Sequence, residues 1–140
     1  MNVMKMIELL IVFFICVSSA YAADGPLAGG PCEYKQYKGQ AKIISITQKR
    51  KPHNYPHEIY EVKFSFTSDQ EVKEKNARTE GKEFVLLLNN SNYPGPKFIE
   101  KYDIQFGNVF KCYMKVIVGG TCTPVVFEFP TIRLDDYFEN

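Results

Sequence analysis

The sequence lacks an excess of charge of one sign. Its 140 residues contain 17 Lys and Arg against 16 Asp and Glu, which gives a formal net charge of +1 at pH 7. Proteins that bind nucleic acids or other polyanions through bulk charge carry a clear basic excess. Nucleic acid is therefore not an expected partner of this protein.

The motifs of several enzyme classes are also missing. The sequence has no G-x-S-x-G nucleophile motif and no C-x-x-C redox motif, and its glycines do not show the spacing of a phosphate-binding loop. Histidine occurs only twice. These absences favour a non-enzymatic protein, and the sequence implies no cofactor.

An export signal is present at the start of the chain. Ile7–Val17 is almost entirely apolar, and Ala20-Tyr21-Ala22 has the A-x-A pattern of a cleavage site. The apolar run is short for a membrane span, although an uncleaved membrane anchor is the alternative. We predict that residues 1–22 are a cleaved signal peptide and that the protein is periplasmic or secreted, with no membrane span after cleavage.

Removal of 22 residues from 140 leaves 118, which suffice for one domain with one core. Residues 23–39 begin with the Gly- and Pro-rich stretch ADGPLAGGP and are predicted to be a flexible N-terminal arm. The chain is rich in Tyr and Phe, with 9 and 11 residues, and abundant aromatics favour strands. Residues 40–140 are therefore predicted to form a single β-barrel domain.

Residues 109–129 have the strongest β-hairpin pattern. Two runs of alternating apolar residues meet at Gly119-Gly120, a dipeptide that favours a tight two-residue turn. With that turn, Met114 would face Val125 and the apolar side chains of both strands would share one face. A one-residue slip would turn one set toward solvent, so we expect this register.

Three cysteines remain after the predicted cleavage, and export would place them in an oxidising compartment. Three single disulfide pairings are open. In the predicted hairpin, Cys112 points to the apolar face and Cys122 to the opposite face, which disfavours a bond between them. We expect a Cys32–Cys122 disulfide and a buried free thiol at Cys112.

Three further segments are predicted to be strands. Gln40–Gln48 has apolar residues whose parity changes between Ile43 and Ile44, so a β-bulge is expected there. Ile59–Thr67 alternates cleanly between apolar and polar residues. Glu83–Leu88 is a short, nearly continuous apolar run, which predicts a strand buried on both faces.

Lys97–Tyr102 is predicted to be a short helix, so the order is three strands, a helix and two strands. This order resembles the five-stranded OB-type barrel, and the resemblance concerns element order alone. We predict an all-β fold, a small five-stranded OB-like barrel with one short helix. An open β-sandwich built from the same strands is the alternative.

The most basic piece of the chain is the predicted loop 49–57, KRKPHNYPH. OB-type barrels often bind ligands on the face of strands two and three, between the loops that join strands one to two and four to five. The candidate ligand-binding residues lie in this loop and on the second strand: Lys49, Arg50, Lys51, Tyr55 and Lys63. A merely solvated loop is the simpler interpretation.

His53 and His57 are four residues apart, a spacing that on a helix would suit a Zn²⁺ or Cu²⁺ ion. Pro52 and Pro56 prevent a regular helix there, and the sequence places no further ligand beside them. Solvated loop histidines are the simpler interpretation, and a metal site is the alternative.

Three functions remain open. The first is a non-enzymatic exported module that binds an exported protein, a peptide or a glycan through the strands 59–67 and 83–88 and the loop 49–57. The second is a small metal-dependent enzyme using His53 and His57. The third is a structural component of an exported or envelope complex, engaged through an edge strand or the C-terminal tail. A shallow basic groove would favour the first, a pocket with converging polar groups the second, and an exposed apolar patch the third.

Overall fold

The computed structural model describes residues 30–137 and 139 of the chain. The predicted signal peptide, residues 1–22, lies outside the described residues, as do residues 23–29 of the predicted arm. No helix in the described part is long and apolar enough to cross a membrane.

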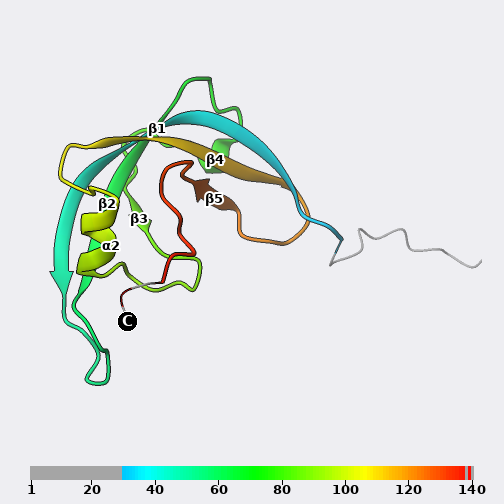
Figure 1. Cartoon of the computed structure of the whole chain (residues 1–140). Coiled ribbons are helices and arrows are strands. Elements are labelled where there is room, and N and C mark those ends of the chain that lie inside the picture. The colour runs from blue at the N-terminus through cyan, green and yellow to red at the C-terminus, as the bar shows by residue number, and fades with distance from the viewer. Residues whose placement is uncertain (1–29, 138, 140) are drawn as a thin grey trace, which may run out of the picture.

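Five antiparallel strands form one curled sheet, a half-barrel against which a short helix packs (Figure 1). In chain order the elements are β1 (Glu33–Lys49), β2 (Ile59–Ser68), the 3-10 helix η1 (Lys75–Ala77), β3 (Phe84–Leu86), α2 (Pro96–Lys101), β4 (Val109–Gly119) and β5 (Val125–Glu128). The order across the sheet is β3-β2-β1-β4-β5. This arrangement confirms the predicted OB-like barrel, because a sandwich would divide the strands between two sheets.

The long strand β1 is the centre of the sheet. It pairs with β4 along residues 33–42 and with β2 along residues 39–49, so its middle is hydrogen-bonded on both sides. The register with β2 shifts between Ile43 and Ser45, which confirms the predicted bulge at Ile44. A bulge increases the local twist and bends the strand, and this bend helps β1 to follow the curve of the barrel.

The predicted N-terminal arm is wrong for residues 33–39, because these residues form the first part of β1. Residues 33–39 show a weaker apolar alternation than the other strands, since Tyr37 is the one buried side chain among them and the other buried residue is Gly39. The Tyr37 ring enters the core while its hydroxyl donates a hydrogen bond to Glu74. Backbone pairing with β4, rather than an apolar pattern, holds this segment in the sheet.

The core fills the inside of the curled sheet. β2 alternates as predicted, with Val62, Phe64 and Phe66 buried on its inner face. The largest fully buried side chains come from β1, β2, β3, β4, α2 and the loops beside the helix: Tyr37, Ile43, Val62, Phe64, Leu86, Pro94, Phe98, Ile104, Cys112, Met114 and Val116.

The hairpin between β4 and β5 departs from the prediction. Val116 pairs with Val125 and Met114 with Phe127, so the register differs by two residues from that of a Gly-Gly turn. The connection runs from Gly120 to Pro124. A shift of two residues keeps the same side chains on the inner face, and the apolar alternation therefore fits both registers equally well.

A disulfide explains the longer connection. Cys122 is bonded to Cys32, the predicted pairing, with Cα atoms 6.1 Å apart. The bond holds the loop against the residues that precede β1, Gly120 adopts a positive φ of 88°, and Pro124 has no N–H to donate to the ladder. Cys112 is the buried free thiol of the described residues, and burial raises its pKa to about 12.

The two end strands, β3 and β5, are not hydrogen-bonded to each other. The gap between them is closed on the inside by aromatic rings, since the centroids of Phe84 and Phe127 lie 4.6 Å apart and Phe64 contacts both Phe127 and Phe129. The strands are therefore paired through their backbones from β3 round to β5, and aromatic side chains pack across the remaining gap.

The strand β3 is shorter and more exposed than predicted. Val85 and Leu87 are 39% and 38% exposed, whereas Leu86 and Leu88 are buried. The prediction of a strand buried on both faces is wrong because, among residues 30–137 and 139, no second layer covers the outside of β3. The run is nearly continuously apolar, yet only alternate residues reach the core.

Candidate functional site

The predicted basic loop projects from one end of the barrel, where the chain passes from β1 to β2 (Figure 1). Arg50, Lys51 and His53 are exposed on this projection, whereas Tyr55 and His57 are partly buried at its base. The structure thus divides the predicted residues into an outer group and an inner group. Lys63 belongs to neither, because it lies in the middle of β2, paired with Val85 of β3.

Most of the predicted positive charge is paired. Three lysines each have a carboxylate within ion-pair distance: Lys49 with Glu61 at 3.5 Å, Lys51 with Glu58 at 3.6 Å and Lys63 with Glu83 at 3.1 Å. The hydrogen bond and the charge of Glu83 raise the pKa of Lys63. Exposed pairs contribute little to stability, but they reduce the net positive potential that would attract an anion. The surface is mixed in charge rather than basic.

The two histidines are held differently. His57 contacts the ring of Tyr55 edge-on, with centroids 5.1 Å apart, and its Nδ1 donates to the backbone oxygen of Glu58 at 2.8 Å. Within residues 30–137 and 139, no group of three or more His, Cys, Asp or Glu side chains is placed to hold a metal ion. The structure brings no third ligand to His53 and His57 from that part of the chain.

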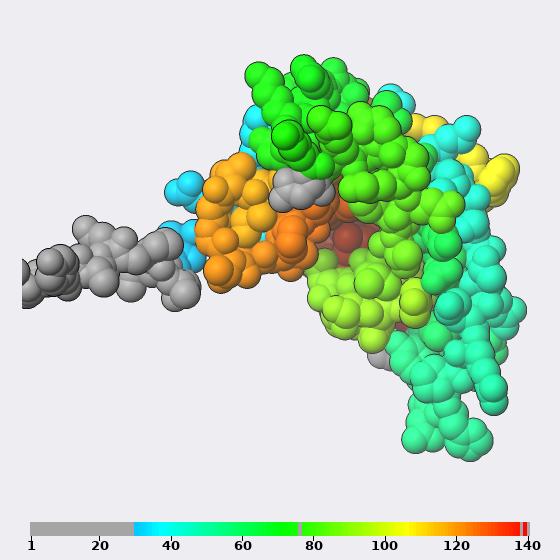
Figure 2. All heavy atoms as spheres, turned by 180° about the vertical axis from the view of Figure 1, so that it is seen from behind, coloured from blue at the N-terminus to red at the C-terminus, as the bar shows by residue number. Residues whose placement is uncertain are grey.

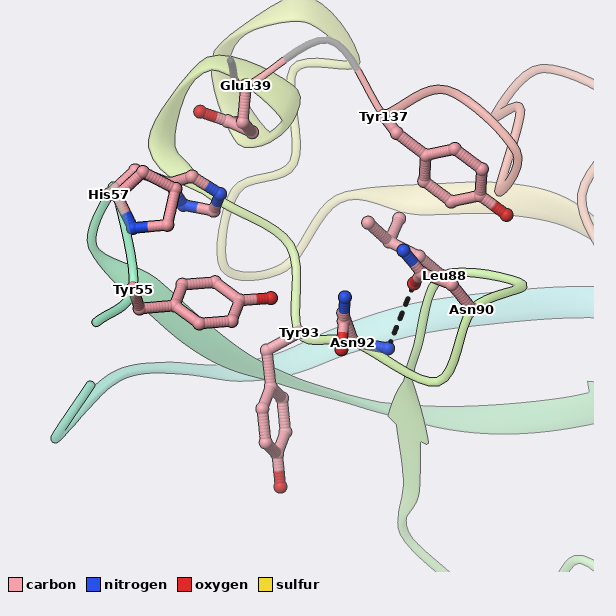
Figure 3. A pocket seen from close by; sticks show the side chains of 9 residues that line it. Tyr55, His57, Leu88, Asn90, Asn92, Tyr93, Tyr137 and Glu139 are labelled. Carbon is pink, nitrogen blue, oxygen red and sulfur yellow. Dashed lines mark hydrogen bonds between the residues drawn. The ribbon is translucent and has the colours of Figure 1, made fainter. Parts of the chain in front are cut away.

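Tyr55 and His57 form one wall of a cavity of about 210 Å³, which we call the end pocket (Figure 3). The remaining walls come from the turn after β3 and from the C-terminal residues. The lining residues are Tyr55, Pro56, His57, Leu88, Asn90, Asn92, Tyr93, Tyr137 and Glu139. Three segments that are far apart in sequence therefore meet at this point.

Polar groups converge on the end pocket. In Figure 3 the Tyr55 hydroxyl points toward Asn92 across the cavity, while the Tyr93 ring points away from it. The Asn92 backbone N–H donates to Asn90 Oδ1 at 3.0 Å, which fixes the turn. The lining thus combines phenol, imidazole, amide and carboxylate groups with the apolar side chains of Pro56 and Leu88.

The C-terminal residues are fastened by polar contacts to α2 and its preceding glycine. Glu139 accepts a hydrogen bond from the backbone N–H of Phe98, and its carboxylate lies against Gly95, where a Cβ would clash with it. Asp136 accepts hydrogen bonds from Lys101 and from the Tyr102 hydroxyl, at 2.5 and 2.6 Å. These contacts place Glu139 at the end pocket.

A second hollow lies between the end strands, and we call it the seam groove. Figure 2 shows it between the residues around β5, in orange, and those around β3, in green, with red C-terminal residues at its floor. Its volume is about 330 Å³. Val85, Leu87, Asn89 and Ser91 line one side, Thr123, Val125 and Val126 the other, and Phe127, Phe129 and Leu134 are among its deeper residues.

The floor of the seam groove is anchored to β3. The backbone N–H of Asn89 donates to the oxygen of Leu134 at 2.9 Å, so the C-terminal segment runs beside the end of β3. Along Phe84–Leu86 the described residues supply a strand partner on the β2 side only. The groove thus combines apolar side chains with an unpaired strand edge.

No family model, curated protein or solved structure matches the chain. Function must therefore be inferred from the geometry of these two sites.

Proposed function

We propose that the protein is an exported, non-enzymatic interaction module that binds an extended segment of a partner polypeptide in the seam groove. The observation that carries this proposal is the free edge of β3 beside the exposed side chains of Val85 and Leu87. Only another polypeptide backbone offers donors and acceptors at the spacing of a strand edge, and addition of a strand to a sheet edge is a common mode of peptide recognition.

The size of β3 limits what the backbone can contribute. The strand has three residues, so an added segment would form few hydrogen bonds with it. Side-chain contacts must supply the remaining affinity, and the groove offers Val85, Leu87, Val125 and Val126 for this purpose. We therefore expect a partner segment with β-branched or aromatic residues at alternate positions, which an extended chain directs to one face.

Export is part of the proposal. The Cys32–Cys122 disulfide is compatible with an oxidising compartment, and disulfides are rare in reducing ones. The A-x-A pattern at Ala20–Ala22 supports cleavage of a signal peptide before the protein reaches the periplasm or the medium. The proposal combines two of the three hypotheses from the sequence. It takes the non-enzymatic binding of an exported protein from the first and the contact through an edge strand from the third.

The test is selection from a displayed library of random linear peptides. We expect enriched peptides to bind the wild-type protein and to lose binding when Val85 and Leu87 are both changed to Lys. N-methylation of alternate backbone positions of the peptide should also abolish binding, because it removes the donors of a strand.

The matched control changes Val109 and Val118 to Lys, two valines of β4 that are 53% and 56% exposed and do not line the groove. This variant should bind peptides as the wild type does. Peptides that bind equally well to V85K/L87K, or that tolerate N-methylation, would exclude strand addition at the seam groove.

A further inference from the structure

We propose that the end pocket binds one neutral hexose unit, either as a free sugar or as the terminal residue of a glycan. This inference does not rest on peptide binding in the seam groove. It rests on the juxtaposition of Tyr55 and His57 with Asn92, Tyr137 and Glu139 around one cavity (Figure 3).

The volume of the pocket selects a small ligand. Pockets for drug-sized molecules typically enclose about 300–1,000 Å³, and the end pocket encloses about 210 Å³. Its walls leave room for a single six-membered ring. Leu88 and Pro56 supply apolar surface, and the rings of Tyr55 and Tyr137 add aromatic surface against which the C–H face of a sugar can pack.

The charge around the pocket argues against an anionic ligand. Neither Lys nor Arg lines the cavity, and the carboxylate of Glu139 does. A phosphate, a sulfate or a free carboxylate would meet that negative charge with no cation among the lining residues. The anionic ligand expected for the basic loop is thus not the ligand of this pocket.

An ammonium ligand would find little to pair with directly. One oxygen of Glu139 already accepts the N–H of Phe98, and the other is buried without a hydrogen-bond partner among the described residues, so the carboxylate offers a cation at most one oxygen that is already engaged. The titration below therefore includes methylamine as the competing ligand.

The hydrogen-bonding groups suit hydroxyls. A hydroxyl both donates and accepts, and the pocket offers both kinds of partner. The Asn92 side-chain amide and the Tyr55 hydroxyl can donate hydrogen bonds. Neither group forms a hydrogen bond to another described residue, so both are available to a ligand. His57 donates through Nδ1 to Glu58, which leaves Nε2 as an acceptor in the neutral ring. A ring with adjacent hydroxyl groups could engage donors and acceptors together.

The test is an NMR titration of the ¹⁵N-labelled protein with the methyl α-glycosides of glucose, mannose and galactose. We expect at least one glycoside to give saturable shifts at residues 55–57 and 88–93, with weak, millimolar affinity. Sodium phosphate and methylamine should give no saturable shift there. Comparison of the free hexose with a glycan that ends in the same hexose then shows which source binds more tightly.

Asn92→Ala removes the side-chain amide but keeps the backbone bonds that Asn92 makes to Leu88 and to Asn90. We expect it to weaken glycoside binding roughly tenfold, because it removes up to two neutral hydrogen bonds. Asn54→Ala, in the exposed part of the same loop, is the control and should bind normally. The spectra themselves report whether each variant is folded.

Several outcomes would overturn the proposal: no saturable shift with any of the three glycosides, shifts that Asn92→Ala leaves unchanged, or saturable shifts with phosphate or methylamine instead. The V85K/L87K variant separates this inference from the proposed peptide binding, because it should lose peptides and keep the glycoside.

Discussion

The two sides of the barrel are built in different ways. On one side, β1 runs for 17 residues between β2 and β4 and is paired with both. On the other side, β3 has three residues and β5 has four, and they are joined to each other by no backbone pairing. We call the first side the wall and keep the name seam for the second.

The difference shows where a ligand can be admitted. Opening the wall would break a hydrogen-bonded ladder in the centre of the sheet. Opening the seam would separate the rings of Phe84 and Phe127 and displace C-terminal residues, which costs side-chain contacts and the backbone hydrogen bond from Asn89 to Leu134 but no strand ladder. Binding sites drawn from regions of low local stability are common, and both candidate sites lie on this side or include C-terminal residues.

The largest expected effect comes from the link between wall and seam. Cys32 precedes β1 in the wall, Cys122 precedes β5 at the seam, and their bond spans 90 residues of sequence. Changing both to Ser is expected to lower the free energy of unfolding by about 4 kcal/mol, because the unfolded chain gains the entropy of an open loop. Urea unfolding of the variant measures this loss.

Reduction of the wild-type protein should reproduce that loss. Cys112→Ala, which leaves the disulfide intact, is the control for thiol chemistry. A loss below about 1 kcal/mol in the double variant would show that backbone pairing alone holds β5 to the wall.

The second prediction concerns the wall. Gly39 pairs with Ser68 on one side and with Cys112 on the other, and a Cβ there would collide with the backbone oxygen of Thr67 and the ring of Phe66. Gly39→Ala should destabilise the protein by about 3 kcal/mol, at the upper end of the range for overpacking, because a backbone atom cannot easily yield.

Gly119→Ala is the matched control for Gly39→Ala. Gly119 is the last residue of β4, and a Cβ added there would lie no closer than 3.4 Å to the nearest atom. Thermal unfolding of the two variants should differ clearly. Equal stability would mean that the wall accommodates the extra atom by a backbone shift.

The wall was more predictable from sequence than the seam. The bulge at Ile44 and the strand at 59–67 follow from side-chain parity, which is a local property. The predicted start of the first strand, at Gln40, came too late, because Tyr37 is the one buried side chain in residues 33–39 and backbone pairing sets the boundary there.

The geometry of the seam could not be predicted because it depends on residues that are distant in sequence. The two registers of the hairpin place the same side chains inward, and the choice between them depends on Cys32, which is distant in sequence. The same holds for the end pocket. Tyr55 and His57 were singled out from the basic loop, but no motif in the sequence points to Asn92, and no local signal shows that Glu139 would reach α2.

The third prediction tests whether side chains hold the seam. The ring of Phe127 contacts those of Phe64, Phe66 and Phe84. Phe127→Ala should cost about 2 kcal/mol, less than the roughly 3–5 kcal/mol of a fully buried Phe, because Phe127 is only partly buried. Amide hydrogen exchange should rise in β3 and β5 more than in β1.

Phe106→Ala is the control for Phe127→Ala, since Phe106 is 76% exposed and should contribute almost nothing. If hydrogen exchange in Phe127→Ala rose uniformly through the sheet, the seam and the wall would be one cooperative unit, and the comparison between them would fail.

The smallest effect is expected at the contact between the C-terminal residues and α2. Hydrogen bonds from Lys101 and Tyr102 lower the pKa of Asp136 below its unfolded value. The ionised Asp136 therefore adds its full stabilisation at any pH above its unfolded pKa of about 4. This stabilisation is lost as the pH falls from there through the lower pKa of the folded state. At neutral pH the contact thus holds the C-terminal residues in place.

Asp136→Asn removes the ion pair with Lys101 at every pH. We expect little change in global stability, because Lys101 is half exposed and the pair is screened by solvent. We expect faster hydrogen exchange at the amides of Asn89 and Phe98, which bond to Leu134 and Glu139. Asp135→Asn, whose pair with Arg133 is fully on the surface, is the control. If the two variants exchange alike, Asp136 does not hold the C-terminal residues, and the other contacts of this segment close the seam.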